Sequence, residues 1–383
     1  MMKHLSFQIG ELPIPLLLGC DCADAIATAM AEIECDTIFI IADANCWKKH
    51  CDRYESPLRL HGRVEIIPWP GRETEKSLSS VEDLAQRLIT RGISRRSLLI
   101  AMGGGVVGNL TGMVAALLFR GIRFVHVPTT LLAMHDSVTS LKQGVNSAGV
   151  KNILGVFYPP SSILIDVRFL TSLPPAQMRC GLAELVKNAL VLGGDYASSL
   201  IPLMHNVYEA DPEQLMRLIE LGVTAKEYLL RDDPHERSVA LRFEYGHTIG
   251  HALELTYNGE LNHGDCVAWG MYCSGWIARA LGYMNNYAGR RHDEMLERLG
   301  ELPRPNVLRP MADVMRRISL DNKRGYLPDK ADDTAAMILL SEPGVIVNGG
   351  MSPPLVPVPK VIIDWALRQL QGHWESAAEC ASR

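Results

Sequence analysis

The sequence predicts an N-terminal α/β domain with a mostly parallel sheet, followed by a mainly α-helical C-terminal domain. Up to about residue 171, short β-branched runs alternate with amphipathic helical patterns, which is the signature of βαβ units. Beyond that point the hydrophobic residues recur mostly with the helical period. At 383 residues the chain also exceeds the usual size of one hydrophobic core. We therefore expect two domains, at residues 1–171 and 172–383.

The composition argues against several classes of function. Hydrophobic residues make up 47% of the chain and charged residues 21%, as in ordinary globular proteins. The net charge of −5 gives no general attraction to nucleic acid or to an anionic membrane. Nine cysteines without paired Cys-x-x-Cys spacing do not indicate a disulfide framework. We expect a cytoplasmic protein with a small-molecule ligand and no nucleic-acid or membrane partner.

The first polar candidates follow a strand expected at residues 37–42. Ligands gather at the carboxyl ends of strands in open α/β sheets, so Asp43 and Asn45 are placed to contact a ribose. A simple turn role fits these two residues equally well.

A polar segment at residues 70–77 precedes an amphipathic run at 81–91. Its Thr and Ser residues are suited to capping the helix that follows. Glu73 and Lys76 are the alternative candidates, as contacts to a nucleotide.

The stretch from 97 to 119 carries a nucleotide-site signal. A buried strand at 97–102 runs into Gly103–Gly105 and Gly108, and a helix is expected at 110–119. Glycines between a strand and a helix let the backbone approach a pyrophosphate, whose charge is favoured at the helix N-terminus. The pattern is neither the usual G-x-G-x-x-G fingerprint nor a P-loop, and a tight structural turn is the alternative.

Another polar segment follows a strand expected at 124–130. The stretch from 136 to 146 contains glycine and has no clear period, and Lys142 lies within it, with Lys151 and Asn152 soon after. We expect an irregular loop that carries a polar site, with a solvated turn as the alternative.

The second half is predicted to contain helices at 178–191, 212–230, 267–281, 292–299, 312–320 and 360–370. Glu184 lies among apolar neighbours, with Lys187 one turn later. These two residues form either a simple ion pair or part of a site in which Glu184 offers an oxygen ligand. The turn at 321–326 is rich in cations and donors, which suits a phosphate monoester as well as a solvated surface.

Three histidines give the strongest site geometry. His247 and His251 are four positions apart, so on a helix both imidazoles project from one face. His263 follows a turn that is able to return the chain over the same helix. Thr248 stands where a zinc peptidase would have its general base, so a peptidase is disfavoured. We expect a metal site with an open position, completed by an oxygen ligand such as Glu184.

Taken together and in order, these motifs resemble the sugar phosphate cyclases of the dehydroquinate synthase-like superfamily, from about Asp43 to Tyr326. The resemblance implies a Rossmann-like NAD-binding domain, a helical metal- and substrate-binding domain, and an active site in the cleft between them. It is carried by Gly103–Gly105 with Gly108, Val127–Ala133, Asp136–Ser137, Lys142, Lys151–Asn152, Glu184–Lys187, Gly246–His251 and His263–Gly264.

Departures from the dehydroquinate synthase pattern indicate a different substrate. Ala240 stands where that enzyme has an arginine, and Glu244 where it has an asparagine. The Ser140–Gln143 segment replaces Gly-Gly-Lys-Thr, and Asn109 replaces a common aspartate, with a role that stays open. A substrate carboxylate needs a fixed cationic fork. Its absence favours D-glucose 6-phosphate, which has no carboxylate.

The subfamily with these features forms the carbocycle of 2-deoxystreptamine antibiotics. The implied enzyme is a phosphate lyase that uses NAD⁺ catalytically and a divalent Zn²⁺ or Co²⁺. Transient oxidation at C4 acidifies the C5 proton, phosphate leaves from C6, hydride returns to C4, and an intramolecular aldol step closes the ring. A homodimer is also implied, with Arg120 reaching a neighbouring subunit's phosphate site.

The resemblance assigns a role to each candidate residue. The metal ligands would be Glu184, His247 and His263. The catalytic residues would be Lys142, Glu244 and His251. The substrate and its phosphate would be bound by Arg120, Lys151, Asn152, Lys187 and Lys323. NAD would be surrounded by Asp43, Asn45, Glu73, Lys76, Gly103, Gly104, Gly105, Thr129, Thr130, Asp136, Lys142 and Lys151.

Other functions remain as alternatives. A 3-dehydroquinate synthase is disfavoured by Ala240, and a sedoheptulose 7-phosphate cyclase by the segments 140–143 and 321–326. A metal-dependent polyol dehydrogenase would share the fold but accumulate NADH. A catalytically silent sugar-phosphate binding protein would not need the complete set of metal ligands.

Overall fold

The computed structural model describes residues 2–60, 62–327 and 331–381. The chain forms two compact units, each built from separate parts of the sequence. The first contains the residues up to Gly181 together with Asn206–His235, and the second contains Leu182–His205 and the residues from Glu236 onward. The chain therefore crosses between the units three times, whereas the sequence predicts one boundary after residue 171.

A seven-stranded sheet lies at the centre of the first unit, in the order β1-β2-β9-β6-β5-β3-β4. β1 is antiparallel to β2, and the other neighbouring strands are parallel. The inner strands are buried along their length, which explains their continuous apolar runs. The predicted α/β fold of this part is confirmed. The strands are β1 (Met2–Ile9), β2 (Leu12–Gly19), β3 (Ile38–Asp43), β4 (Val64–Trp69), β5 (Leu98–Gly103), β6 (Phe124–Pro128) and β9 (Ser162–Asp166).

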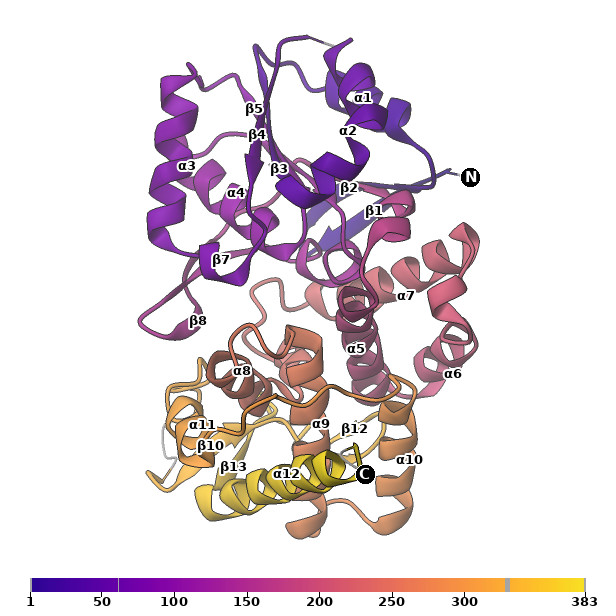
Figure 1. Cartoon of the computed structure of the whole chain (residues 1–383), viewed down its shortest axis with the longest axis vertical. Coiled ribbons are helices and arrows are strands. Elements are labelled where there is room, and N and C mark those ends of the chain that lie inside the picture. Colours follow the sequence, from indigo (N-terminus) through magenta and orange to yellow (C-terminus); the bar gives the residue numbers. More distant parts are fainter. Residues whose placement is uncertain (1, 61, 328–330, 382–383) are drawn as a thin grey trace. The chain divides into compact units, whose positions relative to one another are not determined.

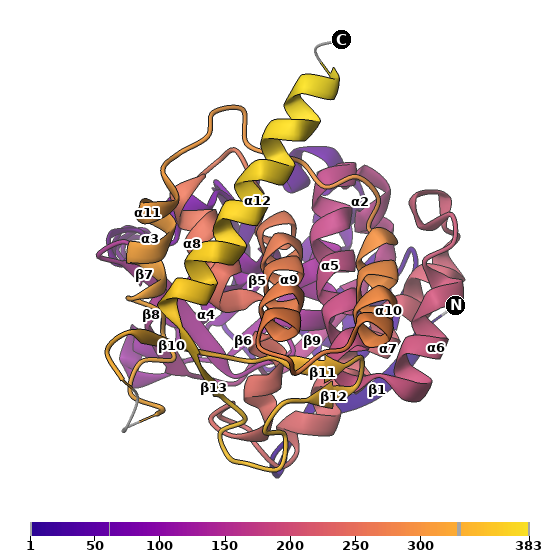
Figure 2. The same cartoon turned by 90° about the horizontal axis from the view of Figure 1, so that it is seen from below.

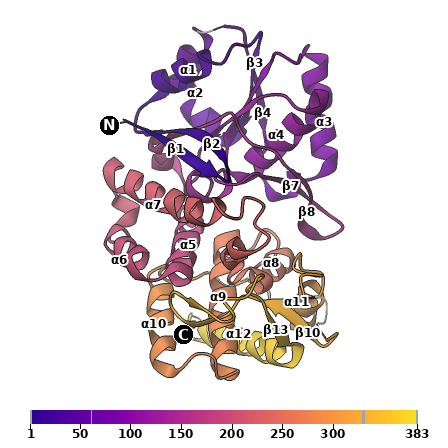
Figure 3. The ribbon, with the colours of Figure 1, turned by 180° about the vertical axis from the view of Figure 1, so that it is seen from behind.

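Helices cover both faces of this sheet (Figure 1). α1 packs beside α2 on one face and α3 beside α4 on the other, as Figure 3 also shows from behind. Their bounds are α1 (Ala23–Ala31), α2 (Ala44–Arg59), α3 (Leu78–Thr90) and α4 (Gly105–Leu117). α4 begins at Gly105 and not near residue 110, so the glycine run itself forms the junction between β5 and the helix.

The irregular loop predicted at 136–146 is wrong in its second half. A short π-helical turn, η3 (Ala133–Ser137), is followed by an antiparallel hairpin of β7 (Lys142–Ser147) and β8 (Val150–Phe157). Ala148 and Gly149 connect the strands, both with positive φ (49° and 71°). Such a two-residue connection matches the right-handed twist of a hairpin. Lys142 and Lys151 therefore lie on paired strands.

α7 (Pro212–Leu230) explains why the first unit is discontinuous. It packs against β1 and against η3. The Nζ atom of the buried Lys226 lies 3.0 Å from Oδ1 of Asp136, and Lys3 forms an ion pair with Glu220 at 2.7 Å. These contacts join residues far apart in the sequence, so no local pattern could reveal them.

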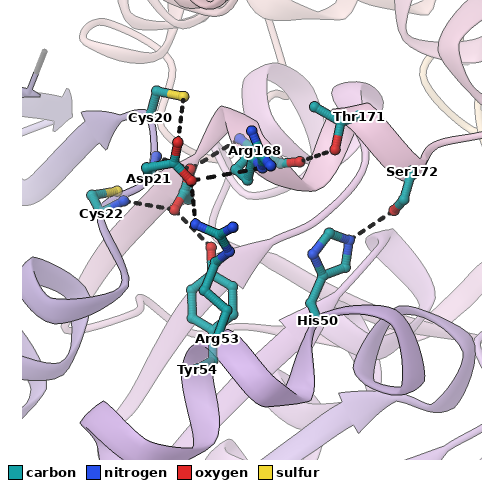
Figure 4. Close-up of polar contacts among 10 residues, drawn as sticks. Cys20, Asp21, Cys22, His50, Arg53, Tyr54, Arg168, Thr171 and Ser172 are labelled. Carbon is teal, nitrogen blue, oxygen red and sulfur yellow. Dashed lines mark hydrogen bonds and ion pairs between the residues drawn. The ribbon is translucent and has the colours of Figure 1, made fainter.

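Asp166, at the end of β9, fixes α2 against the sheet. Its buried carboxylate accepts hydrogen bonds from the hydroxyl of Tyr54 (2.7 Å) and from the backbone N–H groups of Cys22, Asp21 and Arg168. Figure 4 shows Tyr54 on α2 pointing toward the segment that holds Asp21 and Cys22. The later part of α2, which carries Tyr54, is thereby held at the carboxyl end of β9.

The second unit is mainly helical, as predicted. Figure 2 shows α12 lying across α9 and close to α11. Short strands, β10 (Thr334–Met337), β11 (Leu340–Glu342), β12 (Val345–Ile346) and β13 (Val356–Pro359), were not expected from the helical pattern. Within the described residues no helix has the length and apolarity needed to cross a membrane. The helices are α5 (Pro175–Leu192, whose start belongs to the first unit), α6 (Gly194–Leu203), α8 (His247–Thr256), α9 (His263–Ala280), α10 (Asn286–Glu297), α11 (Met311–Ile318) and α12 (Lys360–Ala381).

Candidate active site

Three potential metal ligands converge in the second unit. Glu184 on α5, His247 at the start of α8 and His263 at the start of α9 each offer one ligand atom, and these atoms lie within 4.8 Å of one another. Oε1 of Glu184 lies 3.5 Å from Nε2 of His247 and 3.3 Å from Nε2 of His263. Two imidazoles and one carboxylate form the ligand set that the sequence predicts.

The turn before α8 and the packing of α8 on α9 bring the two histidines together. Gly246 caps α8 with a φ of 77°, and a Cβ there would lie 2.6 Å from Cγ of Met271. A Cβ on Gly270 of α9 would lie 2.0 Å from the carbonyl oxygen of Gly246. Only glycines allow this close approach. The returning chain predicted after residue 255 is therefore present, and it aligns His263 with His247.

Each histidine ligand has a fixed orientation. Nδ1 of His247 lies 3.1 Å from the carbonyl oxygen of Tyr245, and Nδ1 of His263 lies 2.9 Å from Oε2 of the buried Glu254. With the proton on Nδ1, each ring presents the Nε2 lone pair toward Glu184. Such partners set the tautomer and the basicity of metal-binding histidines.

The electrostatics fit a divalent cation. Burial by itself would raise the pKa of Glu184, but Lys187 and the two histidines hold it well below its usual value. Lys187 is ion-paired with Oε2. Oε1, which faces the two Nε2 atoms, is buried and lacks a hydrogen bond of good geometry within the described residues, so a cation there would satisfy it. Burial lowers the pKa of His247, which keeps the ring neutral as metal binding requires.

A second polar group lies next to these ligands. Nζ of the buried Lys323 is 3.4 Å from Oε2 of Glu244 and 2.9 Å from Oδ1 of Asp321. Burial opposes protonation of Lys323, but the two carboxylates raise its pKa above the usual value. The negative charge of Glu244 also acts on His247. A carboxylate able to exchange a proton is therefore present beside the metal ligands.

His251 lies at the edge of the same group. Its ring centroid is 5.0 Å from that of His247 and 5.9 Å from that of His263. His251 is not one of the three residues whose ligand atoms lie within 4.8 Å of one another, although its i,i+4 spacing from His247 places it on the same helix face.

In the first unit, the glycine turn forms a narrow backbone surface at the start of α4. A Cβ on Gly104 would lie 3.2 Å from Cγ2 of Thr130, and one on Gly105 would lie 3.3 Å from Oγ of Ser137. Gly104 occupies the N-cap position, where no side chain caps the first turn of the helix. The N–H groups of that turn are thus available to a pyrophosphate. Asn109 joins α4 to β7, because its Oδ1 accepts from the N–H of Gly144 at 3.0 Å.

A polar cluster connects η1 (Glu73–Glu75) to the β7–β8 hairpin. Oε1 of Glu73 accepts from Nδ2 of Asn146 at 2.8 Å and lies 3.1 Å from Nζ of Lys151. Lys76 donates to the side-chain oxygen of Asn152. The residues predicted to contact a nucleotide from these two segments therefore lie close together, and they bind one another: Glu73 contacts Lys151, and Lys76 contacts Asn152.

The remaining predicted residues lie at the ends of strands and turns. Asp43 caps α2, with Oδ1 accepting from the N–H groups of Asn45 and Cys46, so the turn role holds for this oxygen. The N–H of Thr129 donates to the carbonyl of Gly103. Lys142 is exposed at the start of β7, and Arg120 is exposed in η2 (Leu118–Arg120) with a φ of 66°.

Sequence reasoning missed several residues around these groups. Glu254, Tyr245 and Asn146 hold predicted residues in place, and Lys226 neutralises Asp136. For Glu254 a signal existed, because it follows His247 by seven positions and so lies on the same helix face. Lys226 lies three or four positions from apolar residues on one face of the helix predicted at 212–230, which was also a usable signal.

Family comparisons agree with this architecture. The 3-dehydroquinate synthase N-terminal family matches residues 66–180, and the 3-dehydroquinate synthase C-terminal family matches residues 181–324. The chain therefore belongs to the 3-dehydroquinate synthase family. Within it, the chain is 37% identical to 2-deoxy-scyllo-inosose synthase of Streptoalloteichus tenebrarius, over 96% of this chain and 95% of that protein.

Solved structures show the same relationship. A 2-deoxy-scyllo-inosose synthase in complex with carbaglucose-6-phosphate, NAD⁺ and Co²⁺ superposes with a TM-score of 0.88 at 33% identity, covering 96% of this chain and 100% of that one. The 2-epi-5-epi-valiolone synthase of Streptomyces hygroscopicus, with NAD⁺ and Zn²⁺, gives a TM-score of 0.81 at 26% identity, covering 96% and 99%. The resemblance to sugar phosphate cyclases is confirmed.

Proposed function

We propose that the protein converts D-glucose 6-phosphate to 2-deoxy-scyllo-inosose and phosphate, as a carbon–oxygen lyase acting on a phosphate. The observation that carries this proposal is the similarity, along nearly the whole chain, to enzymes named 2-deoxy-scyllo-inosose synthase. The Glu184–His247–His263 group supports it, since a metal-dependent reaction needs such a set. The product would enter the biosynthesis of 2-deoxystreptamine aminoglycosides.

The chain's residues fit both implied cofactors. Glu184, His247 and His263 would hold the divalent metal, and the glycine turn with Thr129, Thr130, Asp43 and the Glu73–Lys151 cluster would hold NAD⁺. When bound, NAD⁺ supplies reversible oxidation at C4 and the metal polarises the substrate oxygens. The protein's own residues would orient the sugar and move its protons.

Glu244 is the residue we assign to proton transfer at C5. Lys323 lies against its carboxylate and favours the charged form, in which it is able to accept a proton. Lys142 and His251 would contact the hydroxyl groups of the reacting sugar. Lys323 is also ion-paired with Asp321. We propose that its ammonium group stabilises the carboxylate of Glu244 and binds the substrate phosphate.

The substrate site is suited to a phosphate and not to a carboxylate. Ala240 offers no cationic fork, whereas Lys151, Asn152, Lys187 and Lys323 would supply donors for a phosphate monoester. Glucose 6-phosphate has its only charge on the phosphate. This distribution favours it over the acidic substrate of 3-dehydroquinate synthase.

We also propose a cytoplasmic homodimer in which Arg120 binds the substrate phosphate of the neighbouring subunit. Its exposed position and left-handed backbone conformation support a role away from its own helix.

The proposal is tested by incubating the enzyme with glucose 6-phosphate, catalytic NAD⁺ and Co²⁺ or Zn²⁺, while phosphate and NADH absorbance are followed together. Phosphate release without NADH accumulation, with a carbocyclic product identified by mass spectrometry, is the expected result. NADH accumulation without phosphate would indicate a polyol dehydrogenase. Release only from a seven-carbon sugar phosphate would indicate a sedoheptulose 7-phosphate cyclase.

A further inference from the structure

A buried network of hydrogen bonds ends on the backbone that holds His247. The hydroxyl of Tyr245 lies 2.7 Å from Nε2 of His292, and Nδ1 of His292 lies 2.9 Å from Oδ1 of Asp293. Oδ2 of Asp293 accepts from Nη2 of Arg279 at 2.7 Å. We refer to these four residues as the anchoring network. It joins α9 and α10 to the turn before α8.

The network occupies space that is left open for it. A Cβ on Gly275 of α9 would lie 2.7 Å from Cε1 of His292, and one on Gly289 of α10 would lie 2.2 Å from Nε of Arg279. Tyr245 and His292 are both fully buried. The distances give the order of the contacts: the hydroxyl of Tyr245 donates to Nε2 of His292, and Nδ1–H of His292 donates to Asp293. Such a complete network holds its members in one arrangement.

The same residue, Tyr245, contacts His247 through its main chain. Its carbonyl oxygen lies 3.1 Å from Nδ1 of His247, which directs Nε2 toward Oε1 of Glu184. Gly246, between them, has a left-handed conformation and is pressed against α9, so the carbonyl has little freedom once the Tyr245 side chain is fixed. Orientation by a partner on the second ring nitrogen is a general means of tuning metal-binding histidines.

We propose that Tyr245 and His292 are positioning residues for the metal centre: through the anchoring network they hold the Tyr245 carbonyl where it orients His247. This inference rests on the proposed metal site, and it adds residues that do not contact the metal. A purely structural role for Tyr245 would affect folding stability alone. A positioning role would also alter the affinity for the metal and the geometry of its coordination.

The test is titration of the metal-free enzyme with Co²⁺, with the affinity measured by calorimetry and the coordination by visible absorption. Tyr245→Phe keeps the ring but removes the hydroxyl, and we expect it to weaken Co²⁺ binding by about 10-fold and to shift the absorption bands. Asp293→Asn, which changes the far end of the network, should shift the bands in the same direction.

Tyr257→Phe is the matched control. Tyr257 is also fully buried, follows the other end of α8, and has its hydroxyl 3.1 Å from the backbone nitrogen of Arg309; among the described residues no hydrogen bond joins it to His247. We expect it to lower the free energy of unfolding but to leave Co²⁺ binding unchanged. If Tyr245→Phe and Tyr257→Phe bind Co²⁺ equally well with the same spectrum, the inference is overturned. If the wild-type protein binds no Co²⁺, the proposed metal centre itself fails.

Discussion

Oε2 of Glu254 lies 2.9 Å from Nδ1 of His263, and this contact orients one proposed metal ligand from the far end of the helix that carries another. His247 begins α8 and Glu254 lies two turns later, so the same helix supplies one proposed ligand and the orienting group for a second. α9 provides His263 itself. The packing of α8 on α9 therefore decides the geometry of the site.

This arrangement predicts that Glu254→Gln weakens metal binding without removing any ligand. An amide is less effective than a carboxylate at stabilising the Nδ1–H of His263, so the basicity of Nε2 falls. We expect the Co²⁺ affinity of the metal-free protein to fall by about 10- to 100-fold. Glu260→Gln, which alters an ion pair to Arg309 and a hydrogen bond from the N–H of Asn306, is the control. Equal affinities of the two variants would disprove the orienting role.

A second prediction concerns Lys323, which is buried between two carboxylates. Lys323→Met leaves Glu244 and Asp321 without their cation, at a cost of about 3 kcal/mol in the free energy of unfolding at neutral pH. The folded-state pKa of Lys323 is raised, so its contribution is complete below the unfolded-state pKa and is lost as the pH rises through the folded-state value.

Urea unfolding of the wild type and of Lys323→Met at neutral pH and at about pH 11 tests this direction of the pH dependence. The difference in the free energy of unfolding between the two proteins should shrink at the higher pH. A difference that grows with pH would contradict the assignment, because Lys323 would then have a lowered pKa. Arg324→Met, at an exposed neighbouring position, should show little difference at either pH.

The fold was largely predictable because the buried strands and helices have strong local patterns. The apolar run of β3 ends at Asp43 and that of β5 at Gly103, and in both cases a helix begins within two residues. The β7–β8 hairpin was missed because β7 is mostly polar and Ala148, not glycine or asparagine, opens the connecting turn. The packing of α7 in the first unit involves the ion pair between Lys226 and Asp136, which lie 90 positions apart in the sequence. Sequence periodicity carries no information about such distant pairs.

The site was predictable to a different degree. Residue type and spacing indicated His247 and His263, while Glu184 was suggested by its apolar surroundings. The residues that orient these ligands were not found, since the hydroxyl of Tyr245 meets His292 only after α10 has packed on α9. Orienting partners follow from tertiary packing. A sequence motif therefore identifies ligands more readily than the groups that tune them.

A third prediction concerns the polar cluster of the first unit. Glu73→Gln removes the charge that holds Lys151 and weakens the link from η1 to the hairpin. We expect weaker NAD⁺ binding, by about 10-fold, because partly buried charge-assisted hydrogen bonds are worth about 1.5 kcal/mol. Calorimetric titration with NAD⁺ measures the change. Glu75→Gln, in the same short helix, is the matched control, and a loss of equal size in that variant would refute the specific role of Glu73.

The last prediction tests whether Arg120 acts on its own subunit or on its neighbour. Arg120→Ala and Glu244→Gln should each be nearly inactive in phosphate release. If Arg120 serves the neighbouring subunit of a symmetric dimer, each mixed dimer of the two variants has one site with both defects and one with neither. An equal mixture formed by co-expression should then recover about a quarter of the wild-type activity, because half of the dimers are mixed and half of their sites are intact. If Arg120 serves its own subunit, every site carries one defect and no activity returns.

A co-expressed mixture of Glu244→Gln with itself under two different tags provides the baseline. A protein that sediments as a monomer at all concentrations would exclude the neighbouring-subunit role altogether.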